Sequence, residues 1–134
     1  MTNAVTQVAP ADPQAALEHF EREFQFETDC WDVHDALASG DPGFVLLDVR
    51  SPALFATGHV PGATNLPHGK IIASRMEAYP ADTLFVVYCA GTHCNGAARG
   101  AVRLARLRRK VKRMDGGVTG CIDEGFDLAV PVPA

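Results

Sequence analysis

Two continuous apolar runs limit most strongly the folds that this chain can adopt. One run is Phe44-Val45-Leu46-Leu47, which follows a turn rich in glycine and proline, and the other is Leu84-Phe85-Val86-Val87-Tyr88. A run of four or five apolar residues without polar alternation fits a strand that is buried on both faces of a sheet. Sheets of that kind are parallel and carry helices on both faces, so the runs predict an α/β domain.

Segments with helical spacing or helix-start signals separate the predicted strands. We expect further short strands over 24–27, 63–66 and 111–114, and helices over 30–39, 53–57, 70–79, 97–109 and 118–124. Strands that alternate with helices of this length form parallel β-α-β units with right-handed crossovers. The order of the elements therefore agrees with the α/β class.

The N-terminal segment has a different character. Residues 1–12 lack periodicity and are typical of a flexible arm. Asp12 can cap a helix that has Pro13 at its first position and Leu17, Phe20 and Phe24 at helical spacing. We expect residues 1–25 to form this arm and a short amphipathic leader helix, and residues 26–131 to form the folded domain.

Composition excludes several classes of protein. A chain of 134 residues with 47% hydrophobic and 21% charged residues is typical of one globular domain. A formal net charge of -4 predicts neither nucleic acid nor an acidic membrane as a partner. No apolar run approaches the roughly 18–20 residues of a membrane span, and no signal peptide is evident, so we expect a cytoplasmic protein. In that compartment the four cysteines, Cys30, Cys89, Cys94 and Cys121, are expected to be thiols rather than structural disulfides.

The chemistry of an open parallel sheet is found beyond the carboxyl ends of its strands, which here are followed by Asp48–Arg50 and by Cys89–Gly96. Cys89 ends the strongest strand, and its loop consists of Ala90, Gly91, Thr92, His93, Cys94, Asn95 and Gly96. Small residues let the backbone amides of the loop converge on an anion, and the next helix adds the positive end of its dipole. Such a setting lowers the pKa of a thiol and favours a nucleophilic Cys89. A buried cysteine acting as a small hydrophobe is the alternative interpretation.

Several separated motifs resemble those of one family. They are FVLLDVRSPALFATGHVPGATNLP, LFVVYC with its loop, AARGAVRLARL and VKRMDGGVTGCIDEGF. In this order they resemble a rhodanese-type sulfurtransferase domain over roughly residues 26–130. The signature positions are Asp48-Val49-Arg50, Gly58–Ala63, Tyr88-Cys89 and Asp115-Gly116-Gly117.

The resemblance implies a three-layer rhodanese-like fold, with a mostly parallel five-stranded sheet and helices on both faces. It also implies that Cys89 alternates between a thiol and a persulfide. A sulfane sulfur would pass from a small anionic donor, such as thiosulfate, to a thiol or cyanide, with no cofactor. Both the thiolate and the persulfide are anions, so one cradle of amides would serve both half-reactions.

The chain departs from the family pattern in three places. The usual loop is Cys-x-x-Gly-x followed by Arg, Ser or Thr, whereas here Cys94 interrupts the loop and glycines stand two and seven residues after Cys89. Cys121 occupies a position that often holds Trp, which leaves more room under the last helix. Arg108 follows the long helix where glycine is common, so a left-handed helix cap is expected to be less favourable.

Cys94 is the competing nucleophile. His93-Cys94 with Arg99 is similar to the His-Cys-x5-Arg loop of cysteine phosphatases and arsenate reductases, but only four residues separate Cys94 from Arg99. We therefore favour Cys89. Cys94 could still convert a sulfenate or persulfide on Cys89 into a disulfide, which would make the loop redox-sensitive. A noncatalytic, redox-sensing rhodanese-like module thus also stays open.

Other residues support the predicted site. Asp48, Arg50 and Arg99 are expected to lie next to it. Arg50 would draw an anionic donor and Asp48 would fix a loop. Alternatively, Asp48 and Arg50 form a structural ion pair. His59 is expected to hold a turn, and Cys30 and Cys121 to pack in the core. The cysteine and histidine spacing predicts no metal site. Basic residues gather between 99 and 113, where they would form a solvated surface or attract the anionic donor or an acidic protein partner.

Overall fold

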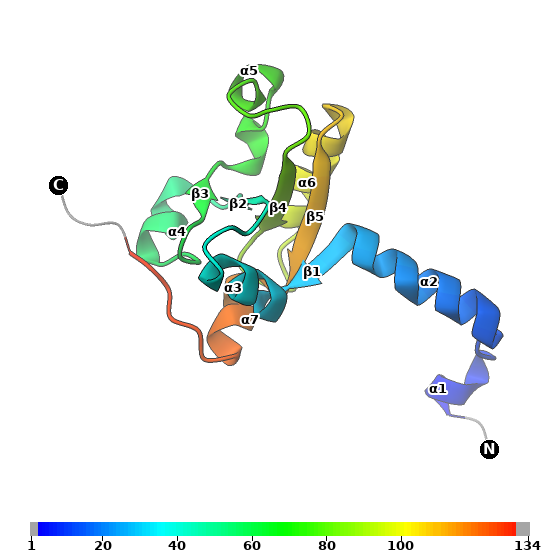
Figure 1. Cartoon of the computed structure of the whole chain (residues 1–134). Helices are drawn as coiled ribbons and strands as arrows, with labels where there is room; N and C mark the ends of the chain where they lie inside the picture. The colour runs from blue at the N-terminus through cyan, green and yellow to red at the C-terminus, as the bar shows by residue number, and fades with distance from the viewer. Residues whose placement is uncertain (1–2, 131–134) are drawn as a thin grey trace.

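The computed structural model describes residues 3–130 and contains a five-stranded sheet, which lies at its centre (Figure 1). The strands are β1 (Glu27–Asp29), β2 (Val45–Asp48), β3 (Thr64–Asn65), β4 (Leu84–Tyr88) and β5 (Lys110–Asp115). Their order is β1-β5-β4-β2-β3, and every pair is parallel. The predicted α/β class is confirmed, and the sheet expected to be mostly parallel is parallel throughout.

Helices cover both faces of the sheet, as predicted. On one face, α5 (Ala73–Met76) and α6 (Gly96–Arg106) pack on Phe85 and Val87 of β4. On the other face, α3 (Cys30–Ala38) and α7 (Gly117–Asp123) pack on Val86 and Tyr88. Alternate residues of β4 thus serve two separate cores, which explains why this strand is apolar without interruption.

The limits of the strand predicted over 24–27 are wrong. α2 (Pro13–Phe26) runs through most of that segment, with Asp12 capping the amides of Gln14 and Ala15. The strand begins only at Glu27, where the chain pairs with Arg113 of β5. The start of β1 is therefore set by its pairing with β5, a long-range contact that local sequence propensity cannot predict.

The helix predicted over 70–79 is also wrong, because two short helices replace it. These are the 3-10 helix η1 (His68–Lys70) and α5, and Ile71 lies between them with an extended backbone. Its side chain is buried against Met76 and Leu104 in one of the two cores. Burial of Ile71 therefore interrupts the helix. The remaining short helix of the domain, α4 (Pro52–Thr57), begins at the Ser51 cap and ends before Gly58, close to its predicted limits.

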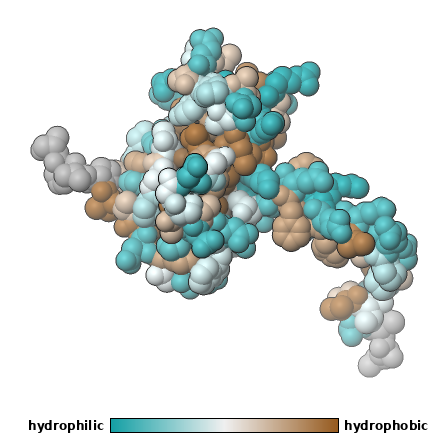
Figure 2. All heavy atoms as spheres, viewed as in Figure 1, coloured by the Kyte–Doolittle hydropathy of each residue, from teal (hydrophilic) through white to brown (hydrophobic). Residues whose placement is uncertain are grey.

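The N-terminal segment extends away from the sheet (Figure 1). Part of the expected arm is helical, since α1 (Ala4–Gln7) forms one turn capped by Asn3. No residue of α2 is buried, and Figure 2 shows apolar side chains along one side of it. Within residues 3–130, no helix is both long and apolar enough to cross a membrane. The predicted end of the domain at residue 131 lies outside the described residues.

The chain after α6 adopts the left-handed conformation that the sequence was expected to disfavour. Arg108 adopts a left-handed conformation with φ of 64°, although it is not glycine. The amide of Arg109 donates to Leu104 O at 2.9 Å, which closes the turn. The Arg109 guanidinium then donates to the carbonyl oxygens of Pro80 and Met76, both at 2.6 Å. These hydrogen bonds hold Arg108 in a conformation that its side chain disfavours.

We expect Arg108→Gly to raise the free energy of unfolding by about 0.5–1 kcal/mol, because glycine reaches positive φ without the steric cost of a Cβ. Urea denaturation under reducing conditions would measure the change. Arg103→Gly, inside α6, is the matched control and should lower stability by about 1 kcal/mol. A loss of stability in both variants would contradict this account of the turn.

Candidate active site

Cys89 lies at the carboxyl end of β4, where the predicted site was placed, and only 6% of it is exposed. Its Sγ forms a disulfide with Cys94 Sγ, with 6.4 Å between the Cα atoms. The expectation that all four cysteines are thiols is therefore wrong for this pair. Cys30 and Cys121 are free, as expected. Cys89 and Cys94 are five residues apart in the sequence, and the tight turn between them brings their sulfur atoms together.

The start of α6 lies directly against the two sulfur atoms. The Gly96 amide donates to Cys94 Sγ at 3.4 Å. A Cβ built on Gly96 would lie 2.8 Å from Cys89 Sγ and 3.3 Å from Cys94 Sγ, so a side chain here would displace the sulfurs. The positive end of an 11-residue helix thus faces both cysteines. This position favours the thiolate form of a reduced cysteine.

The backbone of α7 holds the opposite side of the loop. Val118 N donates to Cys89 O at 3.1 Å, and Thr119 donates to Ala90 O through both its amide and its hydroxyl, at 2.9 Å. A Cβ on Gly117 would collide with Cys89 O, and Gly117 has a positive φ of 56°. Only glycine allows this close approach. The role of Thr119 was missed, because nothing in its sequence neighbourhood marks a contact with residue 90.

A cavity of about 310 Å³ opens beside Cys89 and Cys94. This volume is at the lower end of the roughly 300–1,000 Å³ of small-molecule sites. Of the predicted loop residues, Gly91, Thr92 and Cys94 line it, whereas Ala90, His93, Asn95 and Gly96 do not. The Cys94 amide donates to Gly91 O at 3.2 Å. This amide is therefore not free to bind an anion as part of the predicted cradle.

The charged residues that line this cavity come from β5. They are Asp115, which is one of the signature positions, and Arg113, which belongs to the predicted basic cluster. Arg113 pairs with Glu27 and with Asp115, its Nε lying 3.1 Å from Asp115 Oδ1. Burial, followed by the charge of Glu27, raises the pKa of Asp115. Because Arg113 is already paired with two carboxylates, the backbone amides are the principal positive groups facing the sulfurs.

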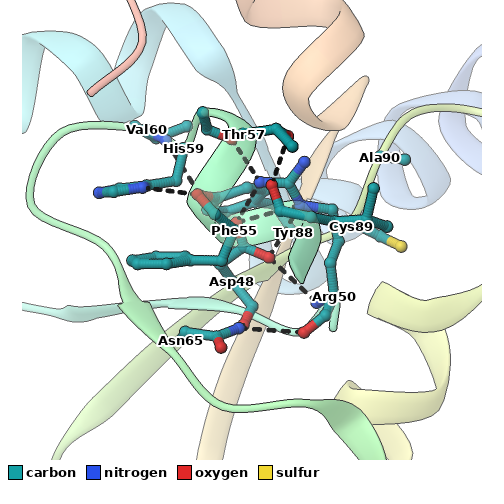
Figure 3. Close-up of polar contacts among 12 residues, drawn as sticks. Asp48, Arg50, Phe55, Thr57, His59, Val60, Asn65, Tyr88, Cys89 and Ala90 are labelled. Atoms are coloured by element: carbon teal, nitrogen blue, oxygen red, sulfur yellow. Dashed lines mark hydrogen bonds and ion pairs between the residues drawn. The ribbon is translucent and has the colours of Figure 1, made fainter. Parts of the chain in front are cut away.

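The structure places Arg50 away from the cavity, which corrects the expectation that it draws the donor. Its Nη2 donates to Asp48 Oδ2 and to Gly58 O, both at 2.6 Å (Figure 3). Asp48 is completely buried and Arg50 is 8% exposed. Burial alone would lower the pKa of Arg50, but hydrogen bonding to Asp48 and its charge raise it. The pair is structural, and in Figure 3 the Cys89 sulfur points away from it.

Tyr88 and His59 make further contacts at the turn after α4. The Tyr88 hydroxyl accepts a hydrogen bond from Val60 N at 3.0 Å. Burial, followed by the charge of Asp48, raises the pKa of Tyr88, so the hydroxyl stays protonated. His59 stacks on Phe55 and its Nδ1 lies 3.0 Å from Phe55 O, which confirms that it holds a turn. Tyr88 was missed as a positioning residue, although a tyrosine in a buried strand signals a hidden hydroxyl that needs a partner.

Arg99 is exposed and also lies outside the cavity. Its Nε donates to Asn95 Oδ1 at 3.1 Å, and its side chain lines a second groove with Ile72, Val102, Arg103 and Arg106. Helical geometry explains this, because positions three to four residues apart along α6 share one side. Of the basic residues predicted to gather between 99 and 113, Arg99, Arg103 and Arg106 therefore line this second groove. Arg113 instead lines the cavity beside the sulfurs.

Cys30 of α3 and Cys121 of α7 pack in the same core, as expected. Both are buried, at 7% and 3% exposure. Burial, followed by the neighbouring Cys30 thiol, raises the pKa of Cys121 to about 12. A thiol in this setting is protonated and inert at neutral pH. The two cysteines therefore serve as packing residues, distinct from the pair in the loop.

The comparisons with known proteins agree with this geometry. A sequence model of the rhodanese-like domain matches residues 32–124, and the chain belongs to that family. A curated relative, the HTH-type transcriptional regulator Rv0324 of Mycobacterium tuberculosis, is 42% identical over 74 residues, 54% of this chain. The match spans 32% of that regulator, about a third of its length.

Solved structures show the same fold. The BH2092 protein of Bacillus halodurans is 28% identical with a TM-score of 0.85, and the match covers 89% of this chain and 87% of that one. A thiosulfate sulfurtransferase from Pseudomonas aeruginosa is 22% identical with a TM-score of 0.66, and the match covers 85% of this chain and 22% of that one. At this identity the second likeness concerns the fold alone.

We expect Asp48→Asn to lower the free energy of unfolding by about 3–5 kcal/mol, because it leaves Arg50 buried without a countercharge. Urea denaturation would measure this loss. Asp41→Asn removes an exposed carboxylate of the same size and should change stability by less than about 0.5 kcal/mol. Equal effects of the two substitutions would refute the structural role of the ion pair.

Proposed function

We propose that this chain is a sulfurtransferase that moves a sulfane sulfur from a small anionic donor of the thiosulfate type to a thiol or cyanide. The position of Cys89 carries the proposal. Its sulfur lies at the end of a buried strand, against the N-terminus of α6 and beside a cavity of about 310 Å³. Membership of the rhodanese-like family supports the same chemistry.

The proposed cycle begins when the Cys89–Cys94 disulfide is reduced. The Cys89 thiolate attacks the outer sulfur of thiosulfate, the sulfur–sulfur bond of the donor breaks, and sulfite leaves with the bonding electron pair. An acceptor thiolate or cyanide then attacks the outer sulfur of the Cys89 persulfide and regenerates the thiolate. We also propose a cytoplasmic location, since the cycle needs Cys89 reduced.

The backbone supplies the electrostatic support in this proposal. The Cys89 thiolate and its persulfide are both anions, and the positive end of the α6 dipole lies beside them, because Gly96 packs against Cys89 Sγ and its amide donates to the neighbouring Cys94 Sγ. Arg113 is paired with Glu27 and Asp115, so it neutralises little of the added charge. Small donors with delocalised negative charge suit such a site better than phosphate esters, which favour a free arginine.

The phosphatase and arsenate reductase alternative has less support. It requires Arg99 to face the oxyanion with Cys94 as nucleophile, but Arg99 lines the second groove. A redox-sensing module is the second candidate, favoured by the Cys89–Cys94 disulfide. Such a module would cycle between thiol and disulfide while leaving thiosulfate unreacted.

The proposal predicts that Cys89→Ser lowers thiosulfate:cyanide sulfurtransferase activity at least about 100-fold, because a neutral hydroxyl cannot replace the thiolate. Cyanide-dependent formation of thiocyanate by the reduced protein is the measurement. Cys30→Ala removes a buried thiol away from the cavity and should keep the wild-type rate. Loss of activity in Cys94→Ser with full activity in Cys89→Ser would reverse the assignment, and an inactive wild type would favour the sensing module.

A further inference from the structure

The two cysteines of the loop can react with each other while the described fold stays intact. Their Cα atoms are 6.4 Å apart, within the roughly 4.4–6.8 Å range of ordinary disulfides. Both sulfurs lie against Gly96, where a side chain would displace them. A thiol at Cys94 is therefore held within reach of Cys89 Sγ.

Cys94 also has the surroundings of a nucleophile. The Gly96 amide, in the first turn of α6, donates to Cys94 Sγ at 3.4 Å and stabilises a negative charge there. Cys94 is partly exposed, whereas Cys89 is buried. An external thiol can thus approach Cys94 more easily than Cys89. The two cysteines are therefore not equivalent: Cys94 has the position of an attacking thiol, and Cys89 that of its buried partner.

We propose that Cys94 is a second catalytic residue, which resolves the Cys89 persulfide and releases its outer sulfur as sulfide. The inference rests on the function proposed above. The Cys94 thiolate attacks Cys89 Sγ, the sulfur–sulfur bond of the persulfide breaks, and the outer sulfur leaves as hydrosulfide with the bonding electrons. The product on the protein is the Cys89–Cys94 disulfide that the structure contains.

The step balances. One thiosulfate and the two thiols of the protein give one sulfite, one hydrogen sulfide and one disulfide. The two cysteines lose two electrons and two protons, and the sulfane sulfur gains the electrons as it becomes sulfide. A small or protein dithiol must then reduce the disulfide, by attack on the more exposed Cys94, before the next turnover.

The position of Cys94 determines which group reacts first with the Cys89 persulfide. Cyanide or a free monothiol must collide with the outer sulfur, whereas Cys94 is already tethered beside the inner one. Tethered reactants have effective concentrations far above those of free acceptors. The preferred reaction is therefore the reductive cleavage of thiosulfate to sulfite and sulfide, driven by a dithiol, with transfer to cyanide as a competing route.

A single turnover without external thiol tests this step. The full chain is reduced, freed of reductant under anaerobic conditions and mixed with thiosulfate. We expect wild type to release one sulfite and one sulfide per chain and to lose two titratable thiols. Its mass should fall by two hydrogen atoms rather than rise by one sulfur atom.

Cys94→Ser should release sulfite but retain the sulfur, so that its mass rises by one sulfur atom and the rate of sulfide release falls at least about 100-fold. Cys94→Ala provides a second variant, in case the hydroxyl disturbs the loop, and circular dichroism checks that both fold. Cys30→Ala controls for loss of a cysteine and should behave as wild type.

The outcomes separate the two proposals. Sulfite release by wild type with a stable persulfide, as in Cys94→Ser, would overturn the role of Cys94 and leave the sulfurtransferase standing. No sulfite from wild type would overturn both. Equal sulfide release by wild type and Cys94→Ser would also reject the resolving step, because the sulfur would then leave by another route.

Discussion

The buried ion pair between Asp48 and Arg50 determines how the edge of the sheet that carries Cys89 is built. Asp48 ends β2 opposite Tyr88 of β4, and Arg50 connects that carboxylate to Gly58 O. The Tyr88 hydroxyl then accepts from Val60 N. A charge in this position cannot be left unpaired, because an unpaired buried ion costs several kcal/mol. The network therefore holds β2, the turn after α4 and β4 in one arrangement, and Cys89 leaves the sheet from it.

Backbone groups, rather than free charged side chains, dominate around the sulfur pair. Gly96 brings the start of α6 onto both sulfurs, and Gly117 brings α7 onto Cys89 O. Arg113, which lines the cavity, and Arg50, which lies outside it, are each paired with carboxylates. Amides fixed in helices need little reorganisation when charge develops, whereas paired arginines would first have to leave their partners. This arrangement suits a sulfur whose negative charge persists through the proposed cycle.

Local patterns predicted some elements better than others. β4 has its predicted limits, since residues 85–88 alternate between the two cores and no polar position interrupts the strand. The limits of β1 were wrong because pairing with β5 sets them, and the 70–79 helix was wrong because Ile71 turns into the core. Arg108 takes a left-handed conformation because the hydrogen bonds of Arg109, made to carbonyls some thirty residues away, hold the turn. In each case a long-range contact outweighed a local preference.

The site likewise combines features that local sequence patterns predict with features that depend on long-range contacts. The amino-acid sequence was sufficient to predict the parallel α/β class, the place of Cys89 at a strand end, the nearness of Cys94 in the loop and the packing role of Cys30 and Cys121. These features depend on periodicity, spacing and residue type, which are local. The folded structure was needed to show that Arg50 is paired with Asp48, that Arg99 lines another groove, and that Arg113 and Asp115 line the cavity. The direction of a side chain depends on which partner can compensate its charge or its hydrogen-bonding groups, and those partners are distant in the chain.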